Sequence, residues 1–402
     1  MSVLSEKNIL IGISGGIAAY KIPFLVRLFV KLKCSIRVVM TPNAKDFVSP
    51  LTLSTLSKNE VLSSFTKKDK DNPIWNDHVE LAKWSDIMII APATSNTISS
   101  MVNAKCDNLL LAIFLSCSSP VFIAPAMDLD MYRNKSNKKN LKKLTKDGYH
   151  VLPAGIGSLA SGLEGEGRML EPEQILEFIE SEISNSLPLN GKKVLITAGP
   201  TYEKIDPVRF IGNNSSGKMG YYLAKNAQKL GADVKLVIGP TNLQMELDGI
   251  ESIRIESSDE MFKIVKKNYK KSDIIISAAA ISDFKPKSIS KNKIKKNNKI
   301  QSIEVEPTTD ILSYLGKNKT NQYLVGFALE TENYIQNANK KLTDKNLDAI
   351  ILNCISDFSP ISSDENKITF ISSDNIIEYK KKSKDNVSKD IFEQIIKRCL
   401  KK

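Results

Sequence analysis

Two successive series of short β-branched runs, each alternating with helical stretches, limit the fold of this sequence more than any other feature. Parallel sheets with helices on both faces are built from strands that are this continuously apolar. The first series comprises "NILIGIS", "SIRVVM", "DIMIIAPA" and "PVFIAPA"; the second comprises "KVLITAG", "DVKLVIG", "SDIIISAAA", "YLVGFALE" and "DAIILN". The sequence therefore predicts the α/β class, with two Rossmann-like domains.

A polar bridge, "SEISNSLPLNGKK" at residues 181–193, separates the two series. It contains a proline, a glycine and no strong periodicity, which is typical of a connection between domains. The chain of 402 residues also exceeds the usual length of a single domain, about 100–200 residues. We therefore predict one domain over residues 1–189 and a second over residues 190–402.

The net charge of +12 is compatible with two kinds of anionic partner. A basic surface attracts nucleic acid and phosphorylated metabolites alike, and free use of lysine accounts for much of the charge. The five cysteines are scattered without C-x-x-C spacing, which indicates a reducing compartment rather than disulfides or a zinc site. Serines and Pro120 interrupt the apolar stretch at residues 108–127, so we expect a helix end and a buried strand instead of a membrane span. These features predict a cytoplasmic protein.

The stretch "GNNSSGKMG" at residues 212–220 has the spacing of a phosphate-binding P-loop without its final residue. Gly212, Gly217 and Lys218 fit the pattern, but Met219 stands where a Ser or Thr hydroxyl would hold Mg²⁺. The preceding strand also ends about a dozen residues too early for a P-loop. We therefore set an ATPase aside and predict a different kind of anion site.

A second glycine turn, "ISGGIAAYK" at residues 13–21, lies between a strand and a helix near the beginning of the chain. Ligands of open α/β sheets bind at such turns, where helix N-termini offer N–H groups to phosphate. The turn is not G-x-G-x-x-G and lacks the acidic residue that binds an NAD ribose. Ser14, Gly15 and Gly16 better suit a single phosphate, as in flavin mononucleotide (FMN).

Nine blocks of the sequence, in order and over nearly the whole chain, carry a resemblance to one family. They are "SGGIAAYK", "NDHVELAKWSDIMIIAPATSNT", "PAMDLDMY" and "GLEGEGRM" in the first half, then "ITAGPTYEKIDPVRFIGNNSSGKMG", "AAAISDFKP", "KIKK", "VGFALET" and "KNLDAIILN". The sequence resembles the bifunctional enzymes of coenzyme A synthesis that join phosphopantothenoylcysteine decarboxylase to phosphopantothenate–cysteine ligase.

For the first domain, the resemblance implies a flavodoxin-like, FMN-dependent decarboxylase. The flavin supplies the electron sink: oxidation of the thiol-bearing carbon lets CO₂ leave, and the remaining enethiolate is reduced to 4′-phosphopantetheine. The resemblance makes His78 catalytic, whereas a lone histidine before a helix is otherwise a cap or a surface residue. The other implied residues are the FMN contacts Ser14, Gly15, Gly16, Thr41, Ser95 and Asn96, and the substrate contacts Met127, Gly165 and Arg168.

Two residues depart from the family pattern in this domain. Asp128 of "PAMDLDMY" stands where an asparagine would grip the substrate carboxylate, and an ionised aspartate would repel that carboxylate. Ser161 of "ASGLEGEGRM" stands where a cysteine would donate the final proton, and a hydroxyl is a far weaker acid than a thiol. One interpretation is a subfamily that uses another donor, such as solvent or His78; the alternative is an impaired or regulatory first domain beside an active ligase.

For the second domain, the resemblance implies a Mg²⁺-assisted, CTP-dependent ligase. The carboxylate of 4′-phosphopantothenate attacks the α-phosphate of CTP, and L-cysteine then displaces CMP from the acyl-cytidylate. Asn213 is implied to stabilise that intermediate, Arg209 to lie near the same substrate, and "GNNSSGKMG" to bind the phosphopantothenate side. The other implied contacts are Ala279, Asp283, Lys293, Pro307, Thr308, Thr309, Asp310, Phe327, Lys341 and Lys345, among which Asp283 reads cytosine, Phe327 stacks on it and the lysines contact triphosphate.

The lysine run at residues 287–299 has three interpretations. Such runs are usually solvated loops, and this one lacks the aromatic residues that stack on bases in nucleic-acid sites. We therefore predict a loop that closes over CTP, and no nucleic-acid partner.

Other FMN-binding decarboxylases or prenyltransferases resemble only the first domain. The family resemblance also implies a homo-oligomer, a dodecamer, built from trimeric decarboxylase and dimeric ligase contacts.

Overall fold

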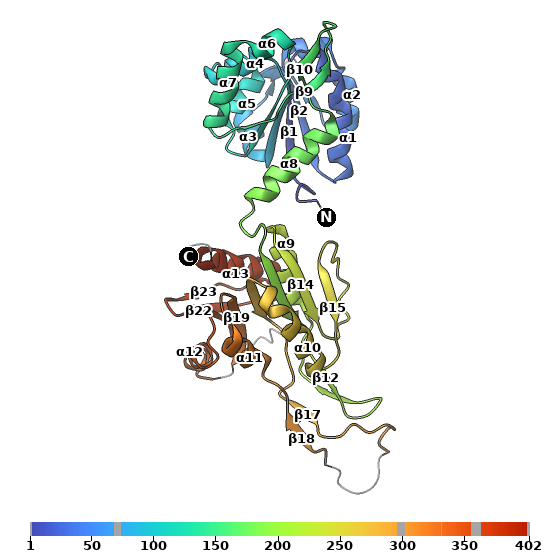
Figure 1. Cartoon of the computed structure of the whole chain (residues 1–402), viewed down its shortest axis with the longest axis vertical. Coiled ribbons are helices and arrows are strands. Elements are labelled where there is room, and N and C mark those ends of the chain that lie inside the picture. Colours follow the sequence, from blue (N-terminus) through green and yellow to red (C-terminus); the bar gives the residue numbers. More distant parts are fainter. Residues whose placement is uncertain (1, 68–73, 296–301, 331, 355–362, 400–402) are drawn as a thin grey trace. The chain divides into compact units, whose positions relative to one another are not determined.

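A computed structural model describes residues 2–67, 74–295, 302–330, 332–354 and 363–399 (Figure 1). The chain forms two compact units, Met1–Ser184 and Asn185–Lys402. Each unit contains an open, mostly parallel sheet with helices on both faces, which confirms the predicted α/β class and Rossmann-like topology.

The N-terminal unit is built on a six-stranded parallel sheet. Its order is β3 (Val61–Leu62), β2 (Ser35–Met40), β1 (Asn8–Ile13), β6 (Ile87–Ala93), β7 (Val121–Pro125) and β8 (His150–Val151). This is the Rossmann order 3-2-1-4-5-6. Without the two-residue edge strand β3 it becomes the flavodoxin-like order 2-1-3-4-5, so both descriptions fit this sheet.

Helices cover both faces of this sheet (Figure 1). One face carries α1 (Ile22–Lys31), α2 (Pro50–Ser57) and α8 (Pro172–Ser186), with the short turns η1 (Ile17–Lys21) and η2 (Pro42–Asp46) at the strand ends. The other carries α3 (His78–Trp84), α4 (Ser95–Val102), α5 (Leu109–Ser116) and α7 (Lys135–Lys146), with α6 (Leu129–Arg133) before α7. Two hairpins complete the unit: β4 (Thr66–Lys67) with β5 (Ile74–Trp75), and β9 (Gly155–Ser158) with β10 (Glu164–Arg168).

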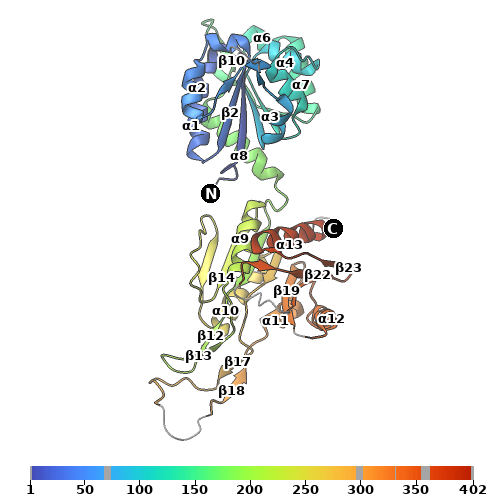
Figure 2. The same ribbon diagram turned by 180° about the vertical axis from the view of Figure 1, so that it is seen from behind.

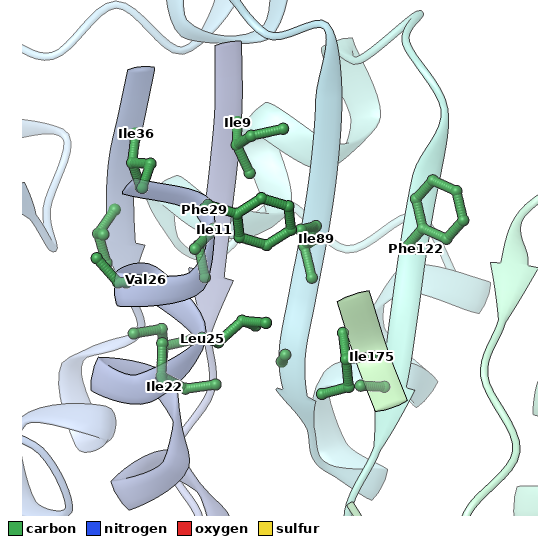
Figure 3. Close-up of a cluster of buried hydrophobic side chains, with 14 of the residues drawn as sticks. Ile9, Ile11, Ile22, Leu25, Val26, Phe29, Ile36, Ile89, Phe122 and Ile175 are labelled. Carbon is green, nitrogen blue, oxygen red and sulfur yellow. The ribbon is translucent and has the colours of Figure 1, made fainter. Parts of the chain in front are cut away.

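Helical periodicity explains how α1 attaches to the sheet. Ile22, Leu25, Val26 and Phe29 recur at intervals of three and four residues, so they lie on one face of the helix and all are fully buried. Figure 3 shows them against isoleucines of β1, β2 and β6, with Phe122 and Ile175 further along the same layer.

The apolar stretch at residues 108–127 forms the predicted helix and buried strand. Asn108 caps α5 by accepting a hydrogen bond from the Leu111 N–H at 3.1 Å, and the helix ends at Ser116 before β7 begins. Among the described residues, no helix combines the length and apolar character that crossing a membrane requires.

The C-terminal unit repeats the design around an eight-stranded sheet. Its order is β15 (Glu251–Arg254), β14 (Asp233–Ile238), β11 (Lys193–Ala198), β16 (Ile274–Ser277), β19 (Tyr323–Glu330), β20 (Ala349–Cys354), β22 (Ile368–Ser372) and β23 (Asn375–Glu378). The first six strands are parallel; β22 pairs antiparallel with β20, and β23 pairs antiparallel with β22. These two antiparallel strands were not anticipated by the sequence analysis.

Helices of the C-terminal unit also cover both faces. α9 (Lys218–Lys229) and α13 (Lys384–Cys399) pack on one face, and α10 (Ser258–Asn268), α11 (Ile311–Asn318) and α12 (Tyr334–Asp344) on the other. The turn η3 (Tyr269–Lys271) follows α10, and a small ladder joins β21 (Glu365–Asn366) to β24 (Lys382–Ser383).

Two hairpins extend from the C-terminal sheet and form what we call the arm (Figures 1 and 2). The arm comprises β12 (Tyr202–Lys204) with β13 (Phe210–Gly212), and β17 (Phe284–Pro286) with β18 (Val305–Pro307). β17 packs against β12 and β13. The rings of Tyr202 and Phe210 stack with centroids 3.7 Å apart, which stiffens the first hairpin.

Candidate active sites

In the N-terminal unit, the order in which successive strands are added to the sheet reverses between β1 and β6, and ligands of α/β folds bind at this switch point. Ser14 follows β1 and is only 1% exposed. Its hydroxyl donates to the Pro92 carbonyl at 2.6 Å and accepts from the Thr94 N–H at 3.0 Å. Ser14 therefore ties the two strand ends together, and its hydroxyl is engaged within the protein.

A cavity of about 410 Å³ opens beside this point. Three segments line it: the turn after β1, the connection from β7 to α6, and the β9–β10 hairpin. The lining residues are Gly16, Ile17, Ala18, Tyr20, Lys21, Ala126, Met127, Asp128, Ser158, Leu159, Ala160, Gly167, Arg168 and Met169. The structure thus brings four predicted residues, Gly16, Met127, Asp128 and Arg168, to one cavity.

A close backbone approach joins the hairpin to the β7–α6 connection. The Met127 N–H donates to the Gly167 carbonyl at 3.0 Å. Gly167 has a φ of 144°, and a Cβ there would lie 2.4 Å from the Met127 carbonyl oxygen. Only glycine allows this contact without movement of the backbone.

Asp128 has a structural role that is independent of any ligand. It is the N-cap of α6, and its Oδ1 accepts a hydrogen bond from the Leu129 N–H at 2.7 Å. An asparagine could make the same cap through its amide oxygen. The departure from the family pattern therefore leaves the local fold intact and changes only charge and hydrogen-bonding capacity within the cavity.

A buried lysine of this cavity was missed by the sequence analysis. Lys21 is 3% exposed, and its ammonium donates to the Met169 carbonyl and to Glu171 Oε1, each at 2.8 Å. Arg168 donates to the same carboxylate oxygen at 2.9 Å. The Lys21 hydrogen bond, together with the two positive charges, lowers the pKa of Glu171 despite partial burial. Lys21 ends the block "SGGIAAYK", but nothing in its spacing indicated burial.

The structure keeps several predicted residues of this domain outside the lining of the cavity. His78 begins α3 and meets the rings of Phe65 and Trp75 edge-on at 6.4 Å. Its Nδ1 is buried without a hydrogen-bond partner among the described residues. Ser161 is exposed and follows Ala160 in the hairpin. The remaining residues outside the lining are Ser14, Gly15, Thr41, Ser95, Asn96 and Gly165.

In the C-terminal unit, a cavity of about 540 Å³ opens where the strand order reverses, between β11 and β16. The segments 213–220, 278–281 and 327–329 line it together with Lys341, Asn353, Asn366 and Lys384. The cavity therefore unites four predicted residues, Asn213, Ala279, Phe327 and Lys341, with the "GNNSSGKMG" stretch.

The glycines of this stretch bring the N-terminus of α9 to the cavity. Gly217 caps α9 with a φ of 74°, and the Ser215 hydroxyl accepts from its N–H at 3.3 Å. A Cβ at Gly220 would lie 2.3 Å from the Cβ of Ala198, so glycine lets α9 lie directly on β11. The N–H groups at the start of a helix attract anions.

Three lysines add positive charge to this cavity. Lys218 forms an ion pair with Asp364, and Lys341 pairs with Glu330 at 2.6 Å. Lys384 is 4% exposed; burial, and then the charge of Lys218, lowers its pKa although Asp364 opposes this. The burial of Lys384 was not predicted, because a lysine at the start of an amphipathic helix ordinarily lies in solvent.

Other predicted contacts lie outside the lining of this cavity. Lys345 pairs with Asp310 at 2.8 Å, and Asp310 caps α11 through the Ser313 N–H at 2.9 Å. The Thr308 hydroxyl donates to the Ser282 carbonyl at 2.6 Å. The predicted residues outside the lining are Arg209, Asp283, Lys293, Pro307, Thr308, Thr309, Asp310 and Lys345.

Two further predictions concern the lysine run and metal binding. Within the run, residues 296–299 lie outside the described residues, so its predicted closure over CTP has no structural description there. Among the described residues, no group of three His, Cys, Asp or Glu side chains is arranged to hold a metal ion.

The fold and the two cavities define an α/β protein of two compact units, with a cavity at the carboxyl edge of each main sheet. Two family models match it: "Flavoprotein" over residues 2–184, and "DNA/pantothenate metabolism flavoprotein C-terminal domain" over residues 189–399. The coenzyme A biosynthesis bifunctional protein CoaBC of Haemophilus influenzae is 39% identical over 399 residues, covering 99% of each chain. The chain belongs to this family of coenzyme A biosynthesis bifunctional proteins, as its nine sequence blocks predicted.

The chain is also similar to a decarboxylase and to a solved C-terminal domain structure of a CoaBC protein. A protein named cysteine/cysteine sulfinic acid decarboxylase, from an unknown prokaryotic organism, is 47% identical over 356 residues, covering 87% of this chain and 99% of that protein. The crystal structure of the C-terminal domain of a CoaBC protein is 40% identical, with a TM-score of 0.47, covering 54% of this chain and all of that chain.

Proposed function

We propose that this protein catalyses two steps of coenzyme A synthesis: ligation of 4′-phosphopantothenate to L-cysteine with CTP, and decarboxylation of the product to 4′-phosphopantetheine. One observation carries the proposal: the sequence is 39% identical to a coenzyme A biosynthesis bifunctional protein in an alignment that covers 99% of both chains. We assign decarboxylation to residues 1–189 and ligation to residues 190–402. This division places one carboxyl-edge cavity in each domain.

The N-terminal cavity suits FMN, which supplies an electron sink for loss of CO₂. Gly16 lines the cavity, and a Cβ at the adjacent Gly15 would lie 2.9 Å from the Cβ of Asn43. Because the turn has no room for a side chain at Gly15, the backbone of Gly15 and Gly16 is what faces the phosphate of FMN. Ser14 then acts by holding the turn in place, since its hydroxyl already bonds to two backbone groups.

The polar side chains of this cavity orient the substrate. Arg168 and Lys21 supply positive charge to the same cavity that contains Asp128. Their charges offset the repulsion between Asp128 and the substrate carboxylate. The final proton comes from Ser161, His78 or solvent. Ser161 is exposed and directly follows Ala160, which lines the cavity. The His78 ring is oriented by the neighbouring rings of Phe65 and Trp75.

In the C-terminal cavity, the phosphates and the carboxylate meet along "GNNSSGKMG". Asn213, whose amide donates to the Ile281 carbonyl at 2.8 Å, faces the phosphopantothenate carboxylate. The N-terminus of α9, with Lys218, faces the 4′-phosphopantothenate side. Lys341 lines the cavity and contacts the phosphates of CTP, together with Lys293 and Lys345 from outside the lining, while Phe327 stacks on the base of CTP. Mg²⁺ binds chiefly through those phosphates, as it commonly does in nucleotide sites.

We also propose that the protein is a homo-oligomer, a dodecamer as the family resemblance implies. Large exposed apolar side chains occur beside the first cavity and on the arm, where contact with another subunit would remove them from water. They include Ile17, Tyr20 and Ile156 in the first group and Val208, Phe210 and Phe284 in the second.

A second candidate function follows from the 47% identity to a cysteine/cysteine sulfinic acid decarboxylase. In that case the N-terminal cavity would accept the free amino acid.

The experiment that tests both candidates supplies purified full-length protein and FMN with 4′-phosphopantothenoylcysteine or with L-cysteine, and follows the products by mass spectrometry. Formation of 4′-phosphopantetheine supports our proposal. If the protein decarboxylates L-cysteine but not 4′-phosphopantothenoylcysteine, the proposal is contradicted. If oxidised enethiol accumulates and Ser161→Cys abolishes this accumulation, protonation by residue 161 limits the reaction.

A further inference from the structure

The arm of the C-terminal unit contains a charged side chain to which the proposed reaction gives no role. Asp206 lies in the turn between β12 and β13, and its side chain is 0% exposed. A carboxylate loses its hydration on burial, so hydrogen bonds and an opposite charge must replace the lost water. The partners of Asp206 therefore show what it holds in place.

Four hydrogen bonds converge on this carboxylate, three from the same turn and one from a distant segment. Oδ1 accepts from the backbone N–H groups of Val208 at 2.8 Å and Arg209 at 2.9 Å. Oδ2 accepts from the Arg209 guanidinium at 3.0 Å and from the Ile294 N–H at 3.1 Å. The same Arg209 nitrogen also donates to the Ile294 carbonyl at 3.0 Å. Asp206 and Arg209 thus hold both backbone polar groups of a residue 88 positions away.

These contacts fix the base of the Lys293 side chain. Ile294 directly follows Lys293, and on the other side the Ser290 N–H donates to the Ile205 carbonyl at 3.0 Å. The segment that carries Lys293 is therefore attached to the β12–β13 turn on both sides. The Arg209 guanidinium is oriented by the same carboxylate oxygen that holds Ile294.

The carboxylate is ionised at neutral pH. Burial raises the pKa of Asp206, but the N–H donors of Val208, Ile294 and Arg209 and the positive charge of Arg209 outweigh burial and lower the pKa overall. Both carboxylate oxygens are needed, because each accepts two hydrogen bonds. An asparagine has one acceptor oxygen, and its NH₂ group would face two donors.

We propose that Asp206 is a positioning residue for ligation, which holds Arg209 and the Lys293 segment together so that both reach the substrates as one unit. The proposal rests on the proposed ligase function and on the roles that the family resemblance implies for Arg209, near 4′-phosphopantothenate, and for Lys293, at the triphosphate of CTP. Asp206 itself touches neither substrate and acts only through these two residues.

The test is Asp206→Asn in the full-length protein. We expect kcat for ligation to fall about 10- to 100-fold, because small misplacement of catalytic groups has effects of this size. The KM for CTP should change much less, and decarboxylation should not change. The matched control is Lys204→Gln, which breaks the exposed Lys204–Glu256 pair at 2.6 Å on the same arm and should leave ligation unchanged.

Two more variants separate this proposal from the function on which it rests. If Arg209→Ala and Lys293→Ala abolish ligation while Asp206→Asn does not impair it, the positioning role is wrong and the ligase assignment stands. If neither alanine variant impairs ligation, both the roles of these residues and the positioning role fall. Should Asp206→Asn fail to fold, hydrogen exchange of the native protein decides: the Ile294 amide should be protected like the Arg209 amide, and rapid exchange at Ile294 alone would overturn the proposal.

Discussion

Replacing Gly167 by alanine should disable the decarboxylase cavity without affecting ligation. The new Cβ would lie 2.4 Å from the Met127 carbonyl oxygen, whereas ordinary contact begins at 3.4 Å. The two backbones must therefore separate by about 1 Å, the difference between these distances. This movement disturbs the Met127–Gly167 hydrogen bond of 3.0 Å and displaces Arg168 and Asp128, which flank these residues in the cavity.

A displacement of 1 Å at a reacting centre costs about 100-fold in rate, so we expect decarboxylation to fall about 100-fold. The assay measures 4′-phosphopantetheine formation and pyrophosphate release on one preparation, and ligation serves as the internal reference. Gly148→Ala is the matched control: its φ is 95°, but nothing lies within 4 Å of the added Cβ. It introduces backbone strain of about 1–2 kcal/mol without displacing the cavity. Equal loss of decarboxylation in both variants would refute the reasoning.

Three further predictions address charge in the two cavities. Asp128→Asn should keep the hydrogen bond to the Leu129 N–H and the thermal stability, and it should lower KM for decarboxylation. Asp128→Ala should lower the free energy of unfolding by about 1 kcal/mol in a denaturant titration. An unchanged KM for Asp128→Asn would contradict repulsion between Asp128 and the substrate carboxylate. Lys384→Met removes a buried positive charge from the proposed CTP cavity and should raise KM for CTP about 10-fold, the size of one charged hydrogen bond to a phosphate. Exposed Lys389→Met, on the same helix, should have no effect. Because its folded-state pKa is lowered, Glu171 contributes stability above its unfolded pKa, and this stability is lost as the pH falls through the folded value. Thermal melts of Glu171→Gln should therefore show a weaker loss of stability below about pH 4.5 than the native chain, and identical profiles would rule out this contribution.

The architecture followed from local pattern because strand and helix periodicity survive in the folded chain. Leu25 and Phe29 of α1 are buried at the intervals that the sequence predicts. The breaks after Ser116 likewise identified α5 as a short buried helix. The antiparallel strands β22 and β23 escaped prediction, because short apolar runs carry no signal for strand direction.

The candidate sites were predicted less completely, because burial and tertiary partners are not local properties. Lys21 and Lys384 lie in short or amphipathic helical segments, where lysine is usually solvated, yet both are buried beside cavities. Asp206 belongs to the recognised "IDPVRF" segment, but its bond to Ile294 spans 88 positions and leaves no mark in spacing. The roles of His78 and Ser161 stay predictions, since neither side chain lines the first cavity.

The most direct test of the account follows the carboxyl carbon of cysteine through both proposed steps. Full-length protein receives L-cysteine labelled with ¹³C at the carboxyl group, together with FMN, Mg²⁺, CTP and 4′-phosphopantothenate, and released ¹³CO₂ is measured. We expect ¹³CO₂ only when CTP and 4′-phosphopantothenate are both present, because the carboxylate is lost only after ligation. Release of ¹³CO₂ from cysteine without either of them would contradict the account and establish a decarboxylase of the free amino acid.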